Sequence, residues 1–493
     1  MRSLYQKEIK IVLIILAFKL MIISLFPLMG DEAYFIKWGH HLSLGYYDHP
    51  PMVGWVIYAM SLISDNFIFF RLFSFFGVLI VAYVIYKILN LYTDKEKSTL
   101  VALLFLVSPV DILLSVLTND VPLLVFGSLG TLFLLYSLEK EQWLRYSLLS
   151  GLFLGMAFLS KYFALFLMLS LVVYTLSIYK TRAIKNVVVI TLIISIFIFE
   201  NLYFNYNSCW NNILFNFLAR TQNSSYSMHG VYGYFLTMLY LITPWGLYFL
   251  VKKTSLVGVD KKVLKLSFSI LSLMLVIFFT VSLKKNVGLH WFLLFLPYLY
   301  LLFSFIDKES LKKFFKFNAI FTAIHIFILL AVIFVPKTYF KGHKKYASLV
   351  VYTQPKDICT KLEKYKNNQM FITGYGMSSF LSYHCKRDIK MLFNKSKYGR
   401  FDDKLLDVRE LEHKKIILFD TKSLKMPSLK KVCRDIKREE IKVDGAKFYI
   451  LECGNFSYKE YKKEYLDVIK EKYYTIPDWL PTNKCYFLDR YYR

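Results

Sequence analysis

Residues 67–92 read FIFFRLFSFFGVLIVAYVIYKILNLY. This run is almost entirely apolar, and it is long enough to cross the hydrocarbon core of a bilayer, which takes about 20 helical residues. Over the whole chain of 493 residues, 56% are hydrophobic and 18% are aromatic, and the mean hydropathy is +0.42. Ordinary soluble proteins of this length are much less apolar. The run therefore predicts a membrane protein, and the composition predicts several spans.

Similar runs recur on both sides of this one. The first follows a basic start but precedes no small-residue cleavage site, so it is interpreted as an uncleaved span. One longer run, at 146–179, holds two short spans that are broken near Ser160 and Lys161. We expect about eleven transmembrane helices, at 11–28, 67–92, 98–117, 121–138, 146–179 (two), 186–205, 232–251, 263–283, 290–306 and 317–335.

The orientation follows from the positive-inside rule. Basic clusters at 95–97, 140–145, 180–185, 252–262 and 308–316 then lie in the cytoplasm. The loops at 29–66, 118–120, 206–231 and 284–289 lie outside, and so does the C-terminal part. We expect a multi-pass membrane protein whose polar residues gather on the outer face.

The apolar runs stop after residue 335, which divides the sequence into a transmembrane domain at 1–336 and a polar domain at 337–493. In the second part, strand-like runs at 370–373, 389–393, 416–419 and 448–451 alternate with helix-permissive stretches. This pattern predicts a small α/β domain on the outer face. Its Gly374-Tyr375-Gly376 lacks the rest of a dinucleotide fingerprint and is interpreted as a turn.

The net charge of +27 does not indicate nucleic-acid binding, because the basic residues of the membrane part cluster in short loops between spans. A basic surface beside anionic lipid headgroups explains the excess. All six cysteines fall outside on the predicted topology, where disulfides are permitted. The spacing does not decide between disulfides and free thiols.

The first outer loop carries the densest chemistry. It begins GDEAYFIKWGHHLSLGYYDHPP at residues 30–51. Asp31 and Glu32 follow the first span at the membrane boundary, where partial shielding from water can tune a carboxylate to act as a general base. The alternative is that Asp31 only caps the helix that follows.

Two further outer segments hold acids. Asp48 and His49 precede two prolines, which make the segment rigid. Asp120 lies at the outer end of a helical hairpin, where capping by Asp120 and catalysis are compatible. Asp48, His49 and Asp31 offer oxygen and nitrogen ligands to a divalent metal ion, but no ligand spacing is diagnostic, so a metal stays an open alternative.

Cations are expected on the same face. Guanidinium and ammonium groups are suitable partners for a phosphate leaving group, whose negative charge grows as its bond to a sugar breaks. The candidates for substrate binding are Arg220, Lys284, Lys285 and His290, together with Glu32, Asp48 and His49.

These residues resemble a family, the bacterial dolichyl-phosphate-mannose–protein mannosyltransferase-like group, which includes the lipid A aminoarabinose transferases. The resemblance covers most of the membrane part and rests on the pair Asp31-Glu32, GYYDHPP at 45–51, RLFS at 71–74, TNDVPLL at 118–124, GLFLGMAFLSKY at 151–162, TP at 243–244 and HW at 290–291. It implies a GT-C fold and inverting transfer of a sugar from a polyprenyl-phosphate donor at the periplasmic face. It also implies that Asp31 is the catalytic base and that Asp120 lies near the donor sugar or the acceptor.

The chain departs from the aminoarabinose transferases at two places. They have Glu-Lys where this chain has Asp48-His49, and the acid binds metal while the lysine meets the donor phosphate. They also place a histidine where this chain has Phe215. Lipid A, another glycan and a protein are the acceptors considered. The alternatives to a transferase are a lipid-linked glycan transporter or flippase, in which intramembrane charges are also expected, and a glycan polymerase or ligase.

Overall fold

The computed structural model describes residues 5–114, 120–219, 226–254, 258–424 and 426–493. The chain divides into two compact units. The first, called the membrane unit, comprises Met1–Phe26, Ala59–Glu200 and Asn223–Ile333. The second, called the C-terminal unit, comprises Pro27–Tyr58, Asn201–Gln222 and Phe334–Arg493. The sequence domains 1–336 and 337–493 stay a prediction.

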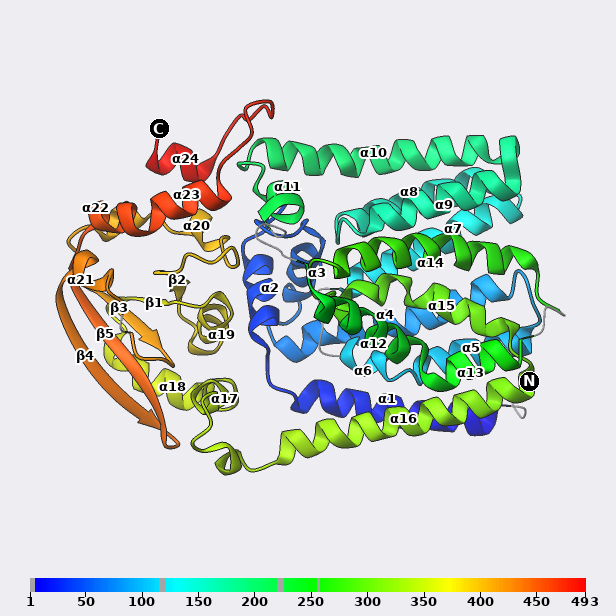
Figure 1. Cartoon of the computed structure of the whole chain (residues 1–493), viewed down its shortest axis with the longest axis horizontal. Coiled ribbons are helices and arrows are strands. Elements are labelled where there is room, and N and C mark those ends of the chain that lie inside the picture. The colour runs from blue at the N-terminus through cyan, green and yellow to red at the C-terminus, as the bar shows by residue number, and fades with distance from the viewer. Residues whose placement is uncertain (1–4, 115–119, 220–225, 255–257, 425) are drawn as a thin grey trace. The chain divides into compact units, whose positions relative to one another are not determined.

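The membrane unit consists of helices. Figure 1 shows α4, α7, α8, α9 and α14 as a bundle of long helices. The helices of this unit, two of which continue into the C-terminal unit, are α1 (Gln6–Leu25), α4 (Phe67–Leu89), α5 (Lys95–Leu106), α6 (Val110–Leu114), α7 (Val121–Glu139), α8 (Trp143–Phe158), α9 (Ala164–Tyr179), η1 (Lys180–Ala183), α10 (Ile184–Tyr206), α12 (Met228–Ile242), α13 (Pro244–Lys252), α14 (Lys261–Ser282), η3 (Leu289–Phe295), α15 (Leu296–Leu302), η4 (Phe303–Phe305) and α16 (Lys308–Phe334).

Five helical stretches in the described part of the chain are long and apolar enough to cross a membrane: Phe67–Leu89, Val121–Glu139, Ala164–Tyr206, Lys261–Ser282 and Lys308–Phe334. The number rises to seven if Gln6–Leu25 with Gly30–His40, and Met228–Ile242 with Pro244–Lys252, each count as one span. The chain is therefore a multi-pass, helical membrane protein. The predicted break near Ser160 and Lys161 is confirmed, because α8 ends at Phe158 and α9 begins at Ala164.

Several predicted spans are interrupted where apolar composition alone suggested one helix. The run at 98–117 contains α5, which ends at Leu106, and the short α6, with Pro109 between them. Proline lacks an N–H and disfavours helical geometry in the residue before it, so a helix seldom continues through it. The run at 232–251 is likewise divided at Thr243, whose φ is +60°, just before Pro244.

Three charged residues inside the membrane unit, Lys19, Asp111 and Arg71, have partners. Lys19 of α1 lies 2.7 Å from Asp111 of α6, and both side chains are fully buried. Arg71, in the RLFS motif, donates to the carbonyl oxygens of Ile23 (2.9 Å) and Phe26 (2.7 Å). An isolated charge in an apolar interior is costly unless it is paired or hydrogen-bonded. These residues therefore hold α1 to its neighbours.

The C-terminal unit mixes helices with a sheet (Figure 1). Its elements are α2 (Gly30–His40), α3 (Met52–Ser61), α11 (Asn211–Leu214), the π-helix η2 (Phe215–Ala219), η5 (Lys337–Phe340), α17 (Tyr346–Thr353), α18 (Pro355–Leu362), η6 (Glu363–Tyr365), β1 (Gln369–Ile372), α19 (Tyr375–Cys385), β2 (Lys390–Met391), α20 (Asp402–Leu405), η7 (Val408–Leu411), β3 (Ile416–Asp420), α21 (Leu429–Val432), β4 (Cys433–Val443), β5 (Ala446–Phe456), α22 (Tyr458–Tyr461), η8 (Lys462–Leu466), α23 (Asp467–Tyr473) and α24 (Tyr486–Tyr491).

The five strands form a mixed sheet in the order β2-β1-β3-β5-β4. β1 pairs in parallel with β2 and β3, whereas β5 runs antiparallel to β3 and β4. The four predicted strand-like runs correspond to β1, β2, β3 and β5. β4 was not predicted, because its sequence CRDIKREEIKV is mostly charged and exposed, as is common for an edge strand that must not pair with other chains.

Candidate functional site

The two neighbouring carboxylates at the start of α2 have different surroundings. Glu32 is buried, and its Oε2 accepts a hydrogen bond from the backbone N–H of Met29 at 3.0 Å. This contact satisfies one of the N–H groups that a helix start leaves without an intrahelical partner. Asp31 is exposed and accepts a hydrogen bond from the Tyr375 hydroxyl at 2.8 Å. Glu32 thus caps the start of α2 by accepting from the Met29 N–H, and the Asp31 carboxylate stays exposed.

Close packing of α2 against α19 brings Tyr375 to Asp31. A Cβ atom at Gly30 would lie 2.8 Å from the Tyr352 hydroxyl oxygen and 3.1 Å from the Cα of Gly376. Only glycine at residue 30 leaves room for the two backbones to approach this closely. Burial and the nearby Asp31 carboxylate raise the pKa of Tyr375. Tyr375 is therefore a neutral hydroxyl that donates to Asp31.

Two further tyrosine rings lie near Tyr375. The buried Tyr34 ring lies 4.9 Å from the Tyr375 ring, and the exposed Tyr398 ring lies 6.4 Å from it. The Tyr34 hydroxyl is buried and has no hydrogen-bond partner among the described residues. The exposed Tyr398 ring and the Asp31 carboxylate offer a stacking surface and a hydrogen-bond acceptor to a sugar-like molecule.

The GYYDHPP segment is held in place by residues that follow α10. The side-chain amide of Asn212 donates to the carbonyl of Tyr46 at 2.8 Å, and that of Asn216 donates to the carbonyl of Asp48 at 3.0 Å. The Tyr46 ring stacks on Trp38 with their centroids 4.4 Å apart. These contacts fix the backbone that carries Asp48 and His49.

Asp48 is buried, and its Oδ1 has no hydrogen-bond partner among the described residues. Its Oδ2 lies 3.7 Å from Nδ1 of His49. Nowhere in the described ranges do three or more His, Cys, Asp or Glu side chains gather as metal ligands. A zinc site takes three or four protein ligands, so Asp48 and His49 alone do not make one.

The second group of candidate residues lies in the membrane unit. Asp120 is buried and forms an ion pair with Lys161, which lies in the break between α8 and α9. Asp120 precedes α7, but its side chain makes no capping hydrogen bond, and Pro122 stands in the first turn of the helix. The capping interpretation of this carboxylate is therefore not supported. Thr118 and Asn119 of the same motif lie outside the described residues.

The loop after α14 lies beside the break that carries Lys161. The Phe163 ring packs 5.1 Å from the Trp291 ring, and Nζ of Lys285 lies 5.2 Å from the centre of the same ring. Lys285 and His290 are half-buried, and Lys284 is exposed. Lys161 and Lys285 thus lie on neighbouring segments of the membrane unit. Arg220 lies outside the described residues.

An apolar cavity begins next to this loop. It has a volume of about 170 Å³, and its lining includes Met238, Leu241, Met274, Phe292, Leu296 and Leu302. Phe292 is two residues from His290. A cavity of this composition suits a hydrocarbon chain.

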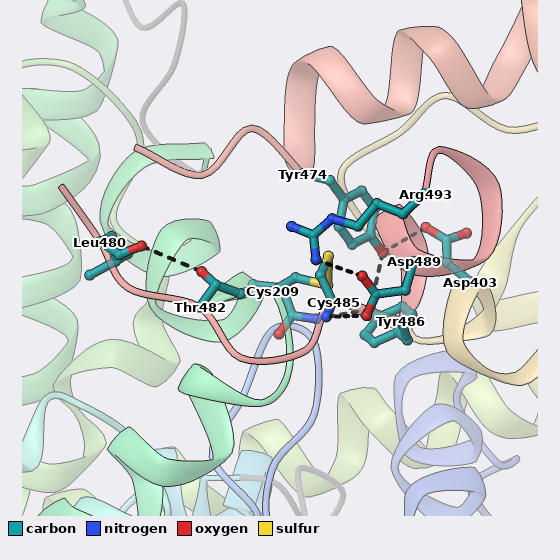
Figure 2. Close-up of a disulfide and its surroundings, with 10 residues drawn as sticks. Cys209, Asp403, Tyr474, Leu480, Thr482, Cys485, Tyr486, Asp489 and Arg493 are labelled. Carbon is teal, nitrogen blue, oxygen red and sulfur yellow. Dashed lines mark hydrogen bonds and ion pairs between the residues drawn. A yellow bond between two sulfur atoms is a disulfide. The ribbon is translucent and has the colours of Figure 1, made fainter. Parts of the chain in front are cut away.

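The segment after α10 is tied to the C-terminus of the chain. Cys209 is bonded to Cys485, and Figure 2 shows this disulfide beside Tyr474 and Asp403. The other two disulfides are Cys359–Cys385 and Cys433–Cys453, so all six cysteines are paired. The Cys209–Cys485 bond joins the segment that holds Tyr46 and Asp48 to the last helix, α24.

The predicted residues Asp31, Glu32, Asp48 and His49 all lie in the C-terminal unit, and Asp31 contacts Tyr375. Sequence reasoning did not single out Tyr375. The only sequence signal was the Gly374-Tyr375-Gly376 string, because two glycines around an aromatic residue permit close backbone approach.

Comparisons with known proteins agree with this picture. The family model of the dolichyl-phosphate-mannose-protein mannosyltransferases matches residues 48–204. The lipid A galacturonosyltransferase RgtD of Rhizobium johnstonii is 31% identical over 179 residues, which are 36% of this chain and 38% of RgtD. The match thus spans well under half of that relative's length.

The fold is that of a solved protein structure. ArnT from Cupriavidus metallidurans, bound to undecaprenyl phosphate, matches with a TM-score of 0.63 and 13% identity over 91% of this chain and 98% of ArnT. ArnT in the apo state matches with a TM-score of 0.63 and 14% identity, over 90% and 97% of the two chains. The resemblance indicated by the sequence motifs is confirmed. The chain carries a region of the dolichyl-phosphate-mannose-protein mannosyltransferase family at residues 48–204, and it has the fold of ArnT.

Proposed function

We propose that this protein is an inverting glycosyltransferase. It moves a sugar from a polyprenyl-phosphate-linked donor to an acceptor at the periplasmic face of the bacterial inner membrane. The observation that carries the proposal is the exposed Asp31 carboxylate, which accepts a hydrogen bond from the Tyr375 hydroxyl. The family match and the ArnT fold support the same activity.

Asp31 is the general base of the proposed reaction. As the acceptor oxygen or nitrogen attacks the anomeric carbon, its proton passes to the Asp31 carboxylate. The bond from the anomeric carbon to the donor phosphate breaks on the opposite side of the sugar, and its electron pair leaves with the phosphate. One direct displacement inverts the configuration and needs no covalent intermediate on the protein. The Tyr375 hydroxyl holds the carboxylate in one orientation for this transfer.

The leaving phosphate requires cations. Arg220, Lys284, Lys285 and His290 are the proposed partners, because charge develops on the phosphate as the bond breaks. Glu32, Asp48 and His49 are proposed to contact substrate around the base. Asp120, ion-paired with Lys161, is proposed to act near the donor sugar or the acceptor.

The apolar cavity that begins at Phe292 is the proposed place for part of the polyprenyl tail. It starts two residues after His290, so a phosphate bound by His290 and Lys285 would have its hydrocarbon chain directed into apolar surroundings. ArnT has been solved with undecaprenyl phosphate, a lipid of this type.

Lipid A is the acceptor that we propose, because RgtD is a lipid A galacturonosyltransferase. The proposed topology has about eleven spans and an outward C-terminal domain at 337–493. Three disulfides, two of them wholly within that part of the chain, agree with an oxidising compartment.

The test uses the purified full-length chain in nanodiscs with an undecaprenyl-phosphate sugar and lipid A. Transfer releases undecaprenyl phosphate and adds mass to lipid A, whereas a transporter or flippase leaves the donor intact. Asp31→Asn is expected to abolish release and to keep the fold. The matched control Asp435→Asn changes an exposed acid on β4 and should retain turnover. Wild-type turnover in Asp31→Asn would refute the role of Asp31 as the base.

A further inference from the structure

A basic and aromatic segment follows the last membrane helix. Residues 337–345, here called the strap, read KTYFKGHKK and contain four lysines and one histidine but no acid. The strap begins three residues after α16 ends at Phe334, and it leads into α17. Three residues of extended chain reach about 10 Å, so Lys337 stays within about 10 Å of the helix end. This distance is about the range over which exposed charges interact at physiological salt.

The strap is open to its surroundings. Tyr339 is 81% exposed and Phe340 is 42% exposed. Lys341 lies 3.9 Å from Asp444, but within the described ranges no acid lies at ion-pair distance from Lys337, Lys344 or Lys345. Exposed aromatic rings and lysines at the end of a membrane helix are typical of the membrane–water interface.

On the proposed topology, the strap lies on the side where the positive-inside rule places few lysines. Four of them in nine residues are therefore unusual on that side. Phosphate-bearing anionic lipids supply negative charge at the level where Lys337 must lie.

A second segment follows α23 (Asp467–Tyr473) and is attached to the end of another membrane helix, α10. Residues 475–484, here called the Trp479 loop, carry a tryptophan that is 79% exposed. The loop is fixed to the end of α10 because the backbone N–H of Asn483 donates to the carbonyl of Tyr206 (3.0 Å) and the indole N–H of Trp210 donates to the carbonyl of Pro481 (2.7 Å).

The disulfide Cys209–Cys485 links the residue just after the loop to the segment that follows α10. Figure 2 shows this disulfide together with Leu480 and Thr482 of the loop. α10 belongs to the candidate span Ala164–Tyr206, and its residues Phe199 and Tyr203 are 70% and 54% exposed. The exposed indole thus belongs to a loop that is attached at the end of a candidate membrane span. Tryptophan is enriched at this level of membrane proteins because its ring is apolar and its N–H is polar.

We propose that the strap and the Trp479 loop dock the C-terminal unit onto an anionic bilayer surface. The lysines of the strap bind the phosphates of lipid headgroups, and Trp479 inserts between the headgroups and the acyl chains. The strap follows the end of α16, and the Trp479 loop is hydrogen-bonded to the end of α10, which makes the bilayer, rather than an acidic protein, the partner. The proposal does not depend on the transferase activity.

The charge contribution is tested by hydrogen–deuterium exchange of the full-length chain in two kinds of nanodisc, one of phosphatidylcholine and one with 30% phosphatidylglycerol. We expect slower exchange across residues 337–345 in the anionic discs, and loss of the difference in 0.5 M salt. The triple variant Lys337→Gln/Lys344→Gln/Lys345→Gln should abolish the difference in exchange between the two discs. Each lysine near an anionic surface increases the binding constant of the strap for that surface by about fivefold.

The matched control is Lys414→Gln/Lys430→Gln/Lys437→Gln, which removes the same charge from exposed positions elsewhere in the C-terminal unit. It should keep the difference between the two discs. Equal exchange of the wild-type strap in both discs, or equal loss in the control variant, would overturn the role of the strap.

The Trp479 contribution is measured as the emission that wild type has and Trp479→Phe lacks. In nanodiscs of lipids with brominated acyl chains, this difference emission should be quenched, and aqueous iodide should quench it little. Strong quenching by iodide with none by brominated lipid would place Trp479 in water and refute its insertion. Neither readout needs donor or turnover, so failure here is distinct from failure of the proposed transferase function.

Discussion

Replacing Tyr375 with Phe removes one hydroxyl and keeps the ring that packs on Tyr34. The lost hydrogen bond, 2.8 Å from the Tyr375 hydroxyl to Oδ1 of Asp31, has a charged acceptor. Such bonds contribute about 1.5 to 3 kcal/mol when buried. Asp31 is exposed and water can replace the donor, so the lower end applies. Because about 1.4 kcal/mol corresponds to a factor of ten, we expect kcat/KM to fall by about tenfold.

The assay is release of undecaprenyl phosphate from an undecaprenyl-phosphate sugar by the chain in nanodiscs. Asp31→Asn should lower kcat/KM by about 10²- to 10⁴-fold, the usual contribution of a general base. In the Asp31→Asn background, the further change Tyr375→Phe should have little effect, because the carboxylate that it orients is gone.

This double-mutant cycle separates positioning from stability. If Tyr375→Phe lowers turnover by the same factor with Asp31 and with Asn at this position, then Tyr375 acts on something other than the base. An unchanged kcat/KM for Tyr375→Phe alone would also refute the positioning role. The thermal midpoint of each variant shows whether the fold is retained.

Further predictions follow from other contacts. Lys161→Met leaves the buried carboxylate of Asp120 without its cation and should lower stability by about 3 to 5 kcal/mol; the double variant Lys161→Met/Asp120→Leu should recover most of the thermal midpoint, and no recovery would contradict the pairing. Burial lowers the pKa of His384 to about 4, below its ordinary value of about 6.5. The unfolded chain therefore binds more protons in this range, and stability should fall as the pH falls from about 6.5 to about 4, by about 1 to 2 kcal/mol after solvent screening. His384→Gln should flatten this part of the curve of thermal midpoint against pH. The bond Cys209–Cys485 closes a loop with a sequence separation of 276, so its removal by the double Ala variant should cost about 2 to 5 kcal/mol and speed hydrogen exchange at 475–485; unchanged exchange there would show that hydrogen bonds alone hold the segment.

Apolar composition predicted the membrane class and most helix positions. It overestimated continuity, because a proline inside an apolar run barely changes the hydropathy but interrupts the helix, as at Pro109 and Pro244. The charged edge strand β4 was missed for the opposite reason, since its residues satisfy the rules for a solvated surface and not those for a buried strand.

At the site, the sequence by itself determined which residue types are available: Asp31 and Glu32 in one helix turn, Asp48 beside His49, and Asp120 before Pro122. These groupings depend only on residues that are close together in the sequence, so helix-start signals and motif spacing reveal them.

Only the tertiary structure decided how these groups are used. In the structure, Glu32 accepts a hydrogen bond at the start of α2, and the Tyr375 hydroxyl donates to Asp31. Asp120 forms a buried ion pair with Lys161. Tyr375 is 344 residues from Asp31 and Lys161 is 41 residues from Asp120. Partners so distant in sequence are selected by the close packing of whole elements, such as α2 on α19 at Gly30 and Gly376, and a side chain's neighbours in such a contact leave no periodic pattern in the sequence.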